Sequence, residues 1–218
     1  LLSIARFIAE CRAAGTEVVL VSSGSVAAGR NAISYKQLPL PINVKQAMAA
    51  VGQSRMMATW AQLFDFDCAQ MLLTHDDLKD RRRYLNIDNT LRTLLANQVL
   101  PIVNENDTVA TAELKVGDND NLAAMVAIVA DADALLICSD IDGLYTANPR
   151  THSDAQLIPI VSRITADIYA MAGGSHHAIG TGGMLTKIQA AEKATAAGID
   201  TLIINGQKAT SFDELLAD

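Results

Sequence analysis

Residues 104–121, with the sequence NENDTVATAELKVGDNDN, contain the chain's densest group of side chains that could bind a ligand. Carboxylates can accept hydrogen bonds from an α-amino group and side-chain amides can donate to a carboxylate, so this composition favours recognition of a small zwitterion. A calcium loop of the EF-hand type is disfavoured, because the run from Asp118 to Leu122 lacks the central glycine of that motif. A solvated loop without a function is the other alternative, although its apolar stretch VATAEL argues against it.

The glycine-rich sequence GTGGMLTK at residues 180–187 is a second candidate, and it opens a predicted helix. Successive backbone N–H groups at such a turn can bind phosphate, and Lys187 adds a positive charge. Neither common nucleotide motif fits: a P-loop needs Ser or Thr after its lysine, where this chain has Ile188, and GxGxxG would need glycine in place of Leu185. The sequence predicts a phosphate-binding turn of another type, with a flexible glycine linker as the alternative.

Two polar turns follow apolar runs that are typical of strands. Ser23, Gly24 and Ser25 come after EVVLVS (17–22), and a turn-rich segment (139–150) follows ALLICS (134–139). Ligands of open α/β sheets bind beyond the carboxyl ends of the strands, so the first turn could hold an anion and the second a nucleotide base or ribose. Ordinary capping turns are the plainer alternative at both places.

Alternating strands and helices must position these groups. Apolar runs predict strands at 17–22, 68–73, 99–104, 134–139 and 201–205, and the clearest helical patterns cover 42–64, 119–130 and 184–197. Continuous Val, Ile and Leu strands joined by helices indicate right-handed crossovers and a mainly parallel sheet covered on both faces. The predicted fold class is α/β, a three-layer α-β-α sandwich.

We expect one domain over residues 1–218, because no linker, charge block or internal repeat divides the chain. Its segments 104–121 and 139–183 are longer than ordinary α/β connections, and such loops are usually functional. The chain starts inside an amphipathic helical pattern and without Met, so we also expect that a segment precedes residue 1.

Charge and cysteine content limit the partners and the compartment. The chain has 24 acidic and 17 basic side chains, which argues against a broad basic surface for nucleic acid or for an anionic membrane. No apolar run reaches the ~18 residues of a membrane-spanning helix. Cys11, Cys68 and Cys138 are widely spaced, without a CxxC pair, which indicates reduced core thiols in a cytoplasmic protein.

Five segments resemble, in order and nearly in spacing, the glutamate 5-kinases of the amino acid kinase family: VSSGSVAAGR, KQAMAAVGQSRMM, NENDTVATAELKVGDNDNLAAMVA, SDIDGLYTANPR and GTGGMLTK. The resemblance covers essentially the whole chain and is most specific in residues 104–124. It implies the amino acid kinase fold and phosphoryl transfer from ATP, with Mg²⁺, to the γ-carboxylate of L-glutamate, the first step of proline biosynthesis. It also implies feedback inhibition by proline and a homodimer or homotetramer.

The resemblance further implies roles for individual residues. The glutamate contacts it implies are Ser23, Gly24, Asn104, Asp107, Asp118 and Asn119. The nucleotide contacts are Ser139 and Asp140, together with the phosphate-binding turn formed by Thr181, Gly182, Gly183, Met184, Leu185, Thr186 and Lys187. The catalytic residues are Lys187, Lys115 and Asp120, while the metal ligands stay open. A carboxylate is itself a nucleophile, so catalysis needs alignment and charge neutralisation rather than a general base.

The chain departs from the family pattern at its ends and near Phe66. The first strand, with a VKLGTS-like motif that contacts phosphates, the closing strand and the PUA domain of many relatives are all absent, so we expect a catalytic domain trimmed at both ends. The sequence between Phe66 and Cys68 is also a few residues short. The alternatives are a kinase for another or an acetylated amino acid, and a non-catalytic amino acid sensor.

Overall fold

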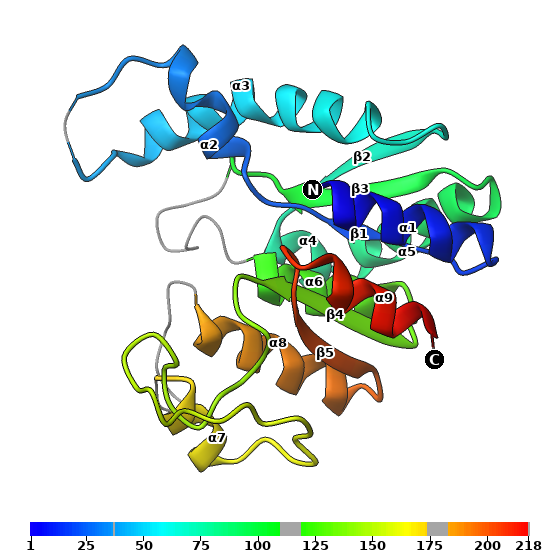
Figure 1. Ribbon diagram of the computed structural model, residues 1–218. Coiled ribbons are helices and arrows are strands. Elements are labelled where there is room, and N and C mark those ends of the chain that lie inside the picture. Colours follow the sequence, from blue (N-terminus) through cyan, green and yellow to red (C-terminus); the bar gives the residue numbers. More distant parts are fainter. Residues whose placement is uncertain (37, 110–118, 174–182, 218) are drawn as a thin grey trace. The chain divides into compact units, whose positions relative to one another are not determined.

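The computed structural model describes residues 1–36, 38–109, 119–173 and 183–217. The chain forms two compact units: the N-terminal unit contains Leu2 and Ile4–Asn119, and the C-terminal unit contains Leu1, Ser3 and Asp120–Asp218. Both units combine helices with parallel strands, so the predicted α/β class is confirmed (Figure 1). One catalytic domain over residues 1–218 stays a prediction.

The N-terminal unit is built on a parallel sheet with the strand order β1-β3-β2. Its strands are β1 (Leu20–Val21), β2 (Cys68–Leu73) and β3 (Leu100–Glu105). All six residues of β3 are buried, as expected for a central strand. Because the strands are parallel, their carboxyl ends meet at one edge of this sheet, where the polar residues after β1 and β3 lie.

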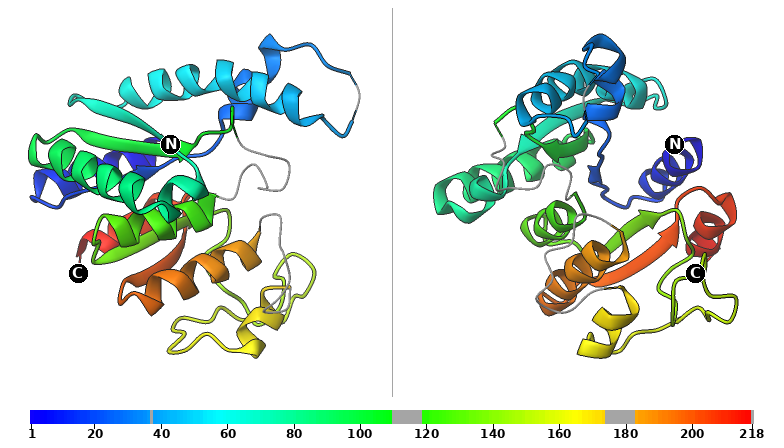
Figure 2. Two further views of the ribbon diagram at one scale, coloured as in Figure 1. Left: turned by 180° about the vertical axis from the view of Figure 1, so that it is seen from behind. Right: turned by 90° about the vertical axis from the view of Figure 1, so that its left-hand side faces the viewer.

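Helices cover both faces of this sheet. They are α1 (Leu2–Ala13), α2 (Ser25–Gly29) with the 3₁₀ turn η1 (Arg30–Ala32), α3 (Ile42–Ala61), α4 (His75–Lys79) and α5 (Arg81–Ala96). Figures 1 and 2 show α3 and α5 on opposite sides of the strands. Ile8 of α1 and Trp60 of α3 share one apolar cluster with Leu100 and Ile102 of β3. Thr74 caps α4 through a reciprocal pair of hydrogen bonds with Asp77, as the capping pattern there predicts.

Strand β1 is shorter than the predicted strand 17–22. Leu20 pairs with Ile102 and Val21 with Val103, a register that places Pro101 opposite Val19. The carbonyl of Val103 accepts from Ser22 N–H, so Pro101, two residues earlier, also faces β1. Its ring nitrogen has no hydrogen to donate, and the ladder therefore ends at Leu20.

The C-terminal unit contains the parallel pair β4 (Ala134–Ser139) and β5 (Asp200–Asn205). Its helices are α6 (Asn119–Val129), α7 (Ala166–Met171), α8 (Met184–Ala196) and α9 (Ala209–Ala217). The right-hand view of Figure 2 shows α6 and α8 on one side of the two strands and α9 on the other. An apolar cluster of α6, β4 and α8 side chains fills the first of these interfaces.

The segment 139–173 is held by a bridge within itself and by packing against α8 of the C-terminal unit. Tyr145 and Leu157 form an antiparallel bridge within it, and Tyr169 of α7 packs with Leu144 against Leu185 of α8. The segment thus has structure of its own, including a helix that the sequence analysis did not predict. This packing holds its polar turns beside the start of α8.

Two expectations about composition can be compared with the structure. Cys11 and Cys68 are partly buried, but Cys138 is exposed, so the prediction of three core thiols was wrong for Cys138. Cys138 is the fifth residue of β4, on an open part of that strand. Over the ranges that the structure describes, no helix is both long and apolar enough to cross a membrane.

Candidate functional site

A buried carboxylate lies just beyond the end of β3, in the N-terminal unit. Asp107 is 8% exposed, and its Oδ2 accepts a hydrogen bond of 2.6 Å from the hydroxyl of Ser25, the first residue of α2. Burial raises the pKa of the Asp107 carboxyl, and the hydrogen bond from Ser25 opposes that shift. The structure thus pairs Asp107, a predicted glutamate contact, with Ser25 of the turn that the sequence analysis offered as an anion site.

Three side-chain amides form a second polar group in the same unit. Asn119 Nδ2 donates to Asn104 Oδ1 over 2.8 Å, and Asn104 Nδ2 donates to Gln53 Oε1 over 2.9 Å. We call Gln53, Asn104 and Asn119 the amide relay. Two of its atoms, Gln53 Nε2 and Asn119 Oδ1, are buried and have no hydrogen-bond partner within the described ranges. The relay therefore ends in one unused donor and one unused acceptor.

The turn after β1 is anchored by the buried residue Ser22, which contacts α3. Ser22 is buried, and its hydroxyl oxygen accepts a hydrogen bond of 2.8 Å from Trp60 Nε1 of α3. Ser23 and Gly24 are exposed, and Gly24 has φ 114°, a left-handed conformation that glycine adopts readily. The backbone thus turns sharply between a fixed strand end and α2, leaving Ser23 open to solvent.

Gln53 had a signal in the sequence that the analysis did not use. It lies on the buried side of α3, among Ala49, Gly52, Met56 and Trp60, and is itself buried. A polar residue on an otherwise apolar helical stripe needs a hydrogen-bond partner, which marks it as a candidate for a site. Ser25 was part of the predicted anion-binding turn, but serine at a helix start is ordinary, so its type alone did not indicate the bond to Asp107.

A lysine and a carboxylate form the polar centre of the C-terminal unit. Lys187 Nζ lies 3.1 and 3.0 Å from the two carboxylate oxygens of Asp120. The hydroxyl of Thr186 donates to Asp120 Oδ2 over 2.6 Å. Their side chains are largely removed from solvent, at 14% exposure for Lys187 and 21% for Asp120. The first turns of α6 and α8 thus hold the ammonium group in one place.

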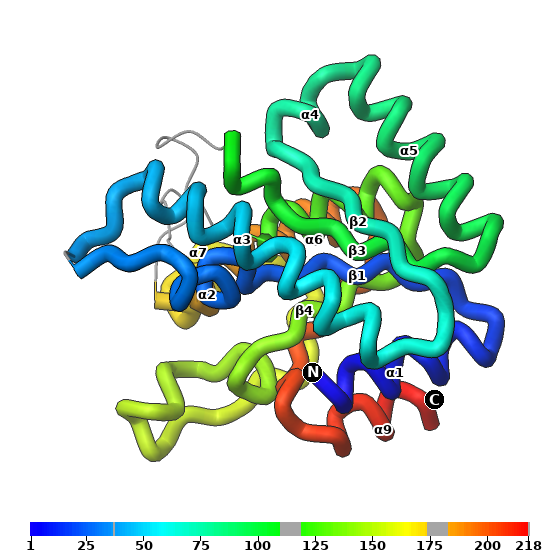
Figure 3. The backbone as a smooth tube through the Cα atoms, turned by 90° about the horizontal axis from the view of Figure 1, so that it is seen from above, coloured from blue at the N-terminus to red at the C-terminus, as the bar shows by residue number. Residues whose placement is uncertain are grey.

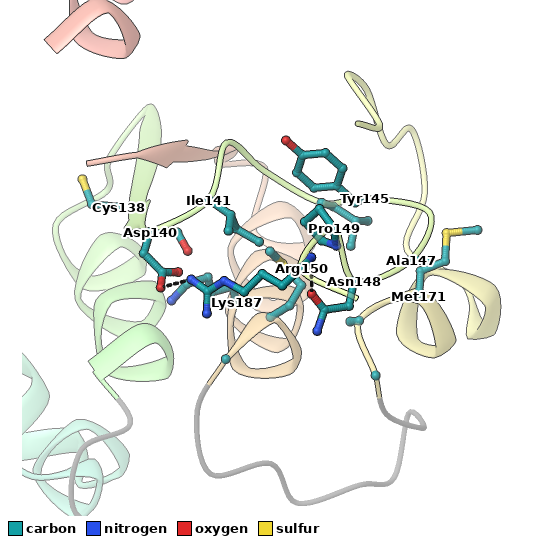
Figure 4. Close-up of a pocket in the computed structure, with 16 residues that line it drawn as sticks. Cys138, Asp140, Ile141, Tyr145, Ala147, Asn148, Pro149, Arg150, Met171 and Lys187 are labelled. Atoms are coloured by element: carbon teal, nitrogen blue, oxygen red, sulfur yellow. Dashed lines mark hydrogen bonds and ion pairs between the residues drawn. The ribbon is translucent and has the colours of Figure 1, made fainter. Parts of the chain in front are cut away.

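A cavity of about 600 Å³ opens beside this lysine, within the C-terminal unit. Its volume is in the ordinary range for a small-molecule site. The structure brings to it, from the predicted nucleotide contacts, Ser139, Asp140, Gly183, Met184 and Lys187. Figure 4 shows Asp140 and Arg150 in contact with each other at this cavity, with Lys187 nearby.

Arg150 and Asp140 form an exposed ion pair at this cavity. Arg150 Nη2 lies 2.5 Å from Asp140 Oδ2, and the hydrogen bond from Arg150 lowers the pKa of the Asp140 carboxyl. Arg150 is therefore a cation beside the cavity, and the sequence analysis included it only as part of the turn-rich segment 139–150.

The wall of the cavity is tied to the end of β5 through Asp142. Its carboxylate accepts hydrogen bonds from Asn205 Nδ2 at 3.1 Å and from Lys208 Nζ at 2.8 Å. The bond from Lys208 is the main cause of the lowered pKa of Asp142. This tether fixes the segment that carries Asp140 and Tyr145.

Not every predicted site residue lies among those described. Lys115, Asp118, Thr181 and Gly182 lie outside the described ranges. Leu185 packs in the apolar cluster with Tyr169 and does not line the cavity. The described residues contain no group of three or more His, Cys, Asp or Glu that could hold a metal. The binding roles of all these residues stay predictions.

Comparison with proteins of known sequence gives close relatives. Glutamate 5-kinase of Idiomarina loihiensis is 59% identical over 216 residues, which are 99% of this chain and 58% of that protein. Glutamate 5-kinase 1 of Pseudoalteromonas translucida is 59% identical over 217 residues, 100% of this chain and 59% of that protein. The chain thus spans less than two thirds of the length of these curated relatives.

Solved structures share the fold at low sequence identity. An isopentenyl phosphate kinase matches with a TM-score of 0.61 and 17% identity, over 99% of this chain and 86% of that one. Uridylate kinase from Archaeoglobus fulgidus matches with a TM-score of 0.58 and 14% identity, over 99% and 85%. The sequence model of the amino acid kinase family matches residues 1–205. The chain therefore belongs to the amino acid kinase family.

Proposed function

We propose that the protein is a glutamate 5-kinase, which transfers the γ-phosphoryl group of ATP to the γ-carboxylate of L-glutamate and so begins proline biosynthesis. The observation that carries this proposal is the 59% identity to proteins of that name over practically all of this chain. The two polar centres agree with it, because one offers carboxylate and amide groups and the other offers a fixed cation beside a cavity.

The N-terminal unit supplies the groups for the amino acid. Buried Asp107 is a suitable partner for the α-ammonium group, because a buried carboxylate is stabilised by an opposite charge. Asn104 and Asn119, which are bonded to each other, add side-chain amides from the same loop region. Ser23 and Gly24 are exposed and add a hydroxyl group and backbone N–H groups. Asp118 joins this set by its place in the family pattern.

The C-terminal unit supplies the groups for the nucleotide. The cavity has room for a purine nucleoside, with Ser139 and Asp140 in its lining. The turn from Thr181 to Lys187 is assigned to the phosphates, because backbone N–H groups at the start of α8 are suited to them. Mg²⁺ enters as MgATP, held mainly by the phosphates, and neutralises part of their charge.

Charge stabilisation is the main catalytic task of the protein. The attacking γ-carboxylate needs no general base, and negative charge on the transferred group is the principal obstacle. Asp120 accepts from the Thr186 hydroxyl and holds Lys187, so the ammonium group of Lys187 is oriented before substrates bind. Asp120 acts through Lys187, and Lys115 is proposed as a second cation.

Regulation, assembly and location follow from the resemblance to the family. We propose that proline inhibits the enzyme by competing for the amino acid site, that the protein is a homodimer or homotetramer, and that it acts in the cytoplasm. A net charge of −7 argues against nucleic acid and anionic membranes as partners, and it means that the anionic substrates must be bound by local positive groups.

A coupled assay of the full-length protein tests the activity. ADP should form from MgATP only when L-glutamate is present, and hydroxylamine should trap the acyl phosphate as the γ-hydroxamate in equal amount. L-Aspartate and N-acetyl-L-glutamate serve as matched acceptors with the same carboxylate chemistry. Equal turnover with either would contradict the proposed substrate, and tight amino acid binding without ADP formation would identify a sensor instead.

A further inference from the structure

Gln53 is the member of the amide relay with an unused donor. Its side chain is 8% exposed, and its Oε1 is already bonded to Asn104 Nδ2. The other arm of the same amide, Nε2, is buried and has no hydrogen-bond partner among the residues that the structure describes. Buried amide hydrogens in folded proteins are almost always satisfied, so this donor indicates a partner other than the described residues of the chain.

The relay also determines which way the Gln53 amide faces. Asn104 uses both ends of its side chain, its Oδ1 toward Asn119 and its Nδ2 toward Gln53. Asn104 is 2% exposed and buried on the central strand, so it cannot turn away to solvent. An amide that presents its oxygen to Asn104 must present its nitrogen on the other side, and the free Nε2 is therefore a pre-oriented donor.

The surroundings favour an anionic oxygen as the partner of this donor. Gln53 follows Gly52, which lies against the backbone of Ser25, the residue bonded to Asp107. The donor of α3 and the acidic acceptor of the loop thus belong to one small region of the N-terminal unit. A donor near a buried carboxylate matches an α-amino acid, which carries a carboxylate and an ammonium group on one carbon.

We propose, building on the glutamate 5-kinase function above, that Gln53 Nε2 donates a hydrogen bond to the α-carboxylate of the substrate and so helps to determine its specificity. The α-carboxylate is a better partner than the γ-carboxylate. A hydrogen bond to the attacking γ-carboxylate would stabilise its charge before reaction and weaken it as a nucleophile. On the α-carboxylate, the same bond selects and orients the substrate without that cost.

Two variants of the full-length protein test this proposal. Gln53→Glu keeps an oxygen for Asn104 Nδ2 and replaces only the free donor by an acceptor. Gln53→Met removes both polar arms at similar volume and adds no charge. Gln62→Met is the matched control, because Gln62 is exposed at the end of the same helix.

The measurements are kcat and KM for glutamate, for ATP and for glutamate α-amide, whose α-carboxamide carries an N–H₂ group. We expect a rise of at least about thirtyfold in the glutamate KM for Gln53→Glu and about tenfold for Gln53→Met, which is the scale of one charge-assisted hydrogen bond. The ATP KM should stay within about twofold. The preference for glutamate over its α-amide should fall at least about tenfold in Gln53→Glu, because the new carboxylate can accept from the amide N–H₂.

Three results would overturn the inference. They are an unchanged glutamate KM in folded Gln53→Met, an equal loss for glutamate and α-amide in Gln53→Glu, and a loss that falls on kcat alone. The first would assign the donor to a structural water, and the others would give Gln53 a role in folding or alignment. If Gln53→Glu does not fold, the glutamate KM of Gln53→Met alone tests the proposal. A wild-type protein that forms no glutamyl hydroxamate would instead refute the proposed function, and this inference with it.

Discussion

Asp107 combines deep burial with a single short hydrogen bond from Ser25, and the two have opposite effects on its charge. Burial raises its pKa because the charged form loses hydration, whereas the hydroxyl of Ser25 stabilises the carboxylate and lowers it. In the proposed function the carboxylate must be ionised to bind the α-ammonium group. Substrate binding should therefore be lost as the pH falls through the pKa of Asp107.

Replacing Ser25 by Ala should move this loss to higher pH. Without the hydrogen bond the pKa of Asp107 rises further, so the acid limb of the pH profile of kcat/KM for glutamate should shift to higher pH. Ser54→Ala is the control, because Ser54 is exposed and bonds only to its own helix. A pH profile of Ser25→Ala that coincides with that of Ser54→Ala would show that Asp107 does not govern binding.

Lys187 should affect the chemical step more than nucleotide binding. Lys187→Met keeps much of the side-chain length but removes the charge that Asp120 orients, and we expect kcat to fall about 10²- to 10³-fold with a smaller change in the ATP KM. Steady-state kinetics measures both. Lys79→Met, which removes an exposed lysine on α4, should leave both constants unchanged. A kcat within tenfold of wild type would assign the main charge stabilisation to another cation.

At the scale of elements, the crossing of α2 and α3 sets the position of Ser25. Figure 3 shows the two helices against each other. A Cβ atom on Gly52 would lie 1.7 Å from the carbonyl oxygen of Ser25, and one on Gly29 would lie 1.8 Å from that of Met48. Both obstacles are backbone atoms, so no side-chain movement can relieve them. The glycines permit a contact that brings Ser25 to Asp107.

Gly52→Ala tests this crossing, because helix propensity and packing predict opposite results. Alanine in a helix interior is favoured over glycine by about 1 kcal/mol, whereas separating the two helices should lower the free energy of unfolding by roughly 1–3 kcal/mol. We expect the destabilisation to dominate, together with a higher glutamate KM. Urea unfolding measures the first quantity, with Ala50→Gly at an exposed position of α3 as the propensity control. A stabilised Gly52→Ala protein would contradict the close crossing.

The helices and strands were predictable where their own residues show a clear apolar pattern. The apolar runs 68–73 and 134–139 are strands with the predicted bounds, because a short and nearly continuous apolar run is typical of a strand. The length of β1 was not predictable from its own residues, since it depends on Pro101 in a neighbouring strand. Helix α7 was missed because its six residues acquire their apolar contacts from α8.

The candidate site was predictable to a similar degree. Asn104, Asp107 and Asp120 lie in or beside a loop of unusually polar composition. Lys187 ends a glycine-rich turn, so the sequence indicates all four directly. Gln53 and Arg150 acquire their significance from partners that are distant in the sequence or lie across a turn. A single polar residue on a helix, or one arginine in a turn, has too many ordinary explanations for its type alone to assign a role.

At the scale of the whole molecule, each unit contains its own polar centre. Asp107 and the amide relay belong to the N-terminal unit, and Lys187 with its cavity belongs to the C-terminal unit. The first turn of α6 contributes to both centres, because Asn119 bonds to Asn104 while the next residue, Asp120, bonds to Lys187. A ligand that orders either centre should therefore also stabilise this turn.

Hydrogen exchange of the full-length protein with single ligands can show this division of roles. Glutamate alone should slow exchange at residues 22–25 and 104–107, and a non-hydrolysable ATP analogue alone should slow it at residues 138–150, because amides that become ordered or hydrogen-bonded open less often. Either ligand should protect residues 120–123 at the start of α6. D-Glutamate is the control for the first arm. Protection of residues 138–150 by glutamate alone would show that the proposed roles of the two units must be exchanged. An unprotected start of α6 with either ligand would contradict its proposed link to both centres.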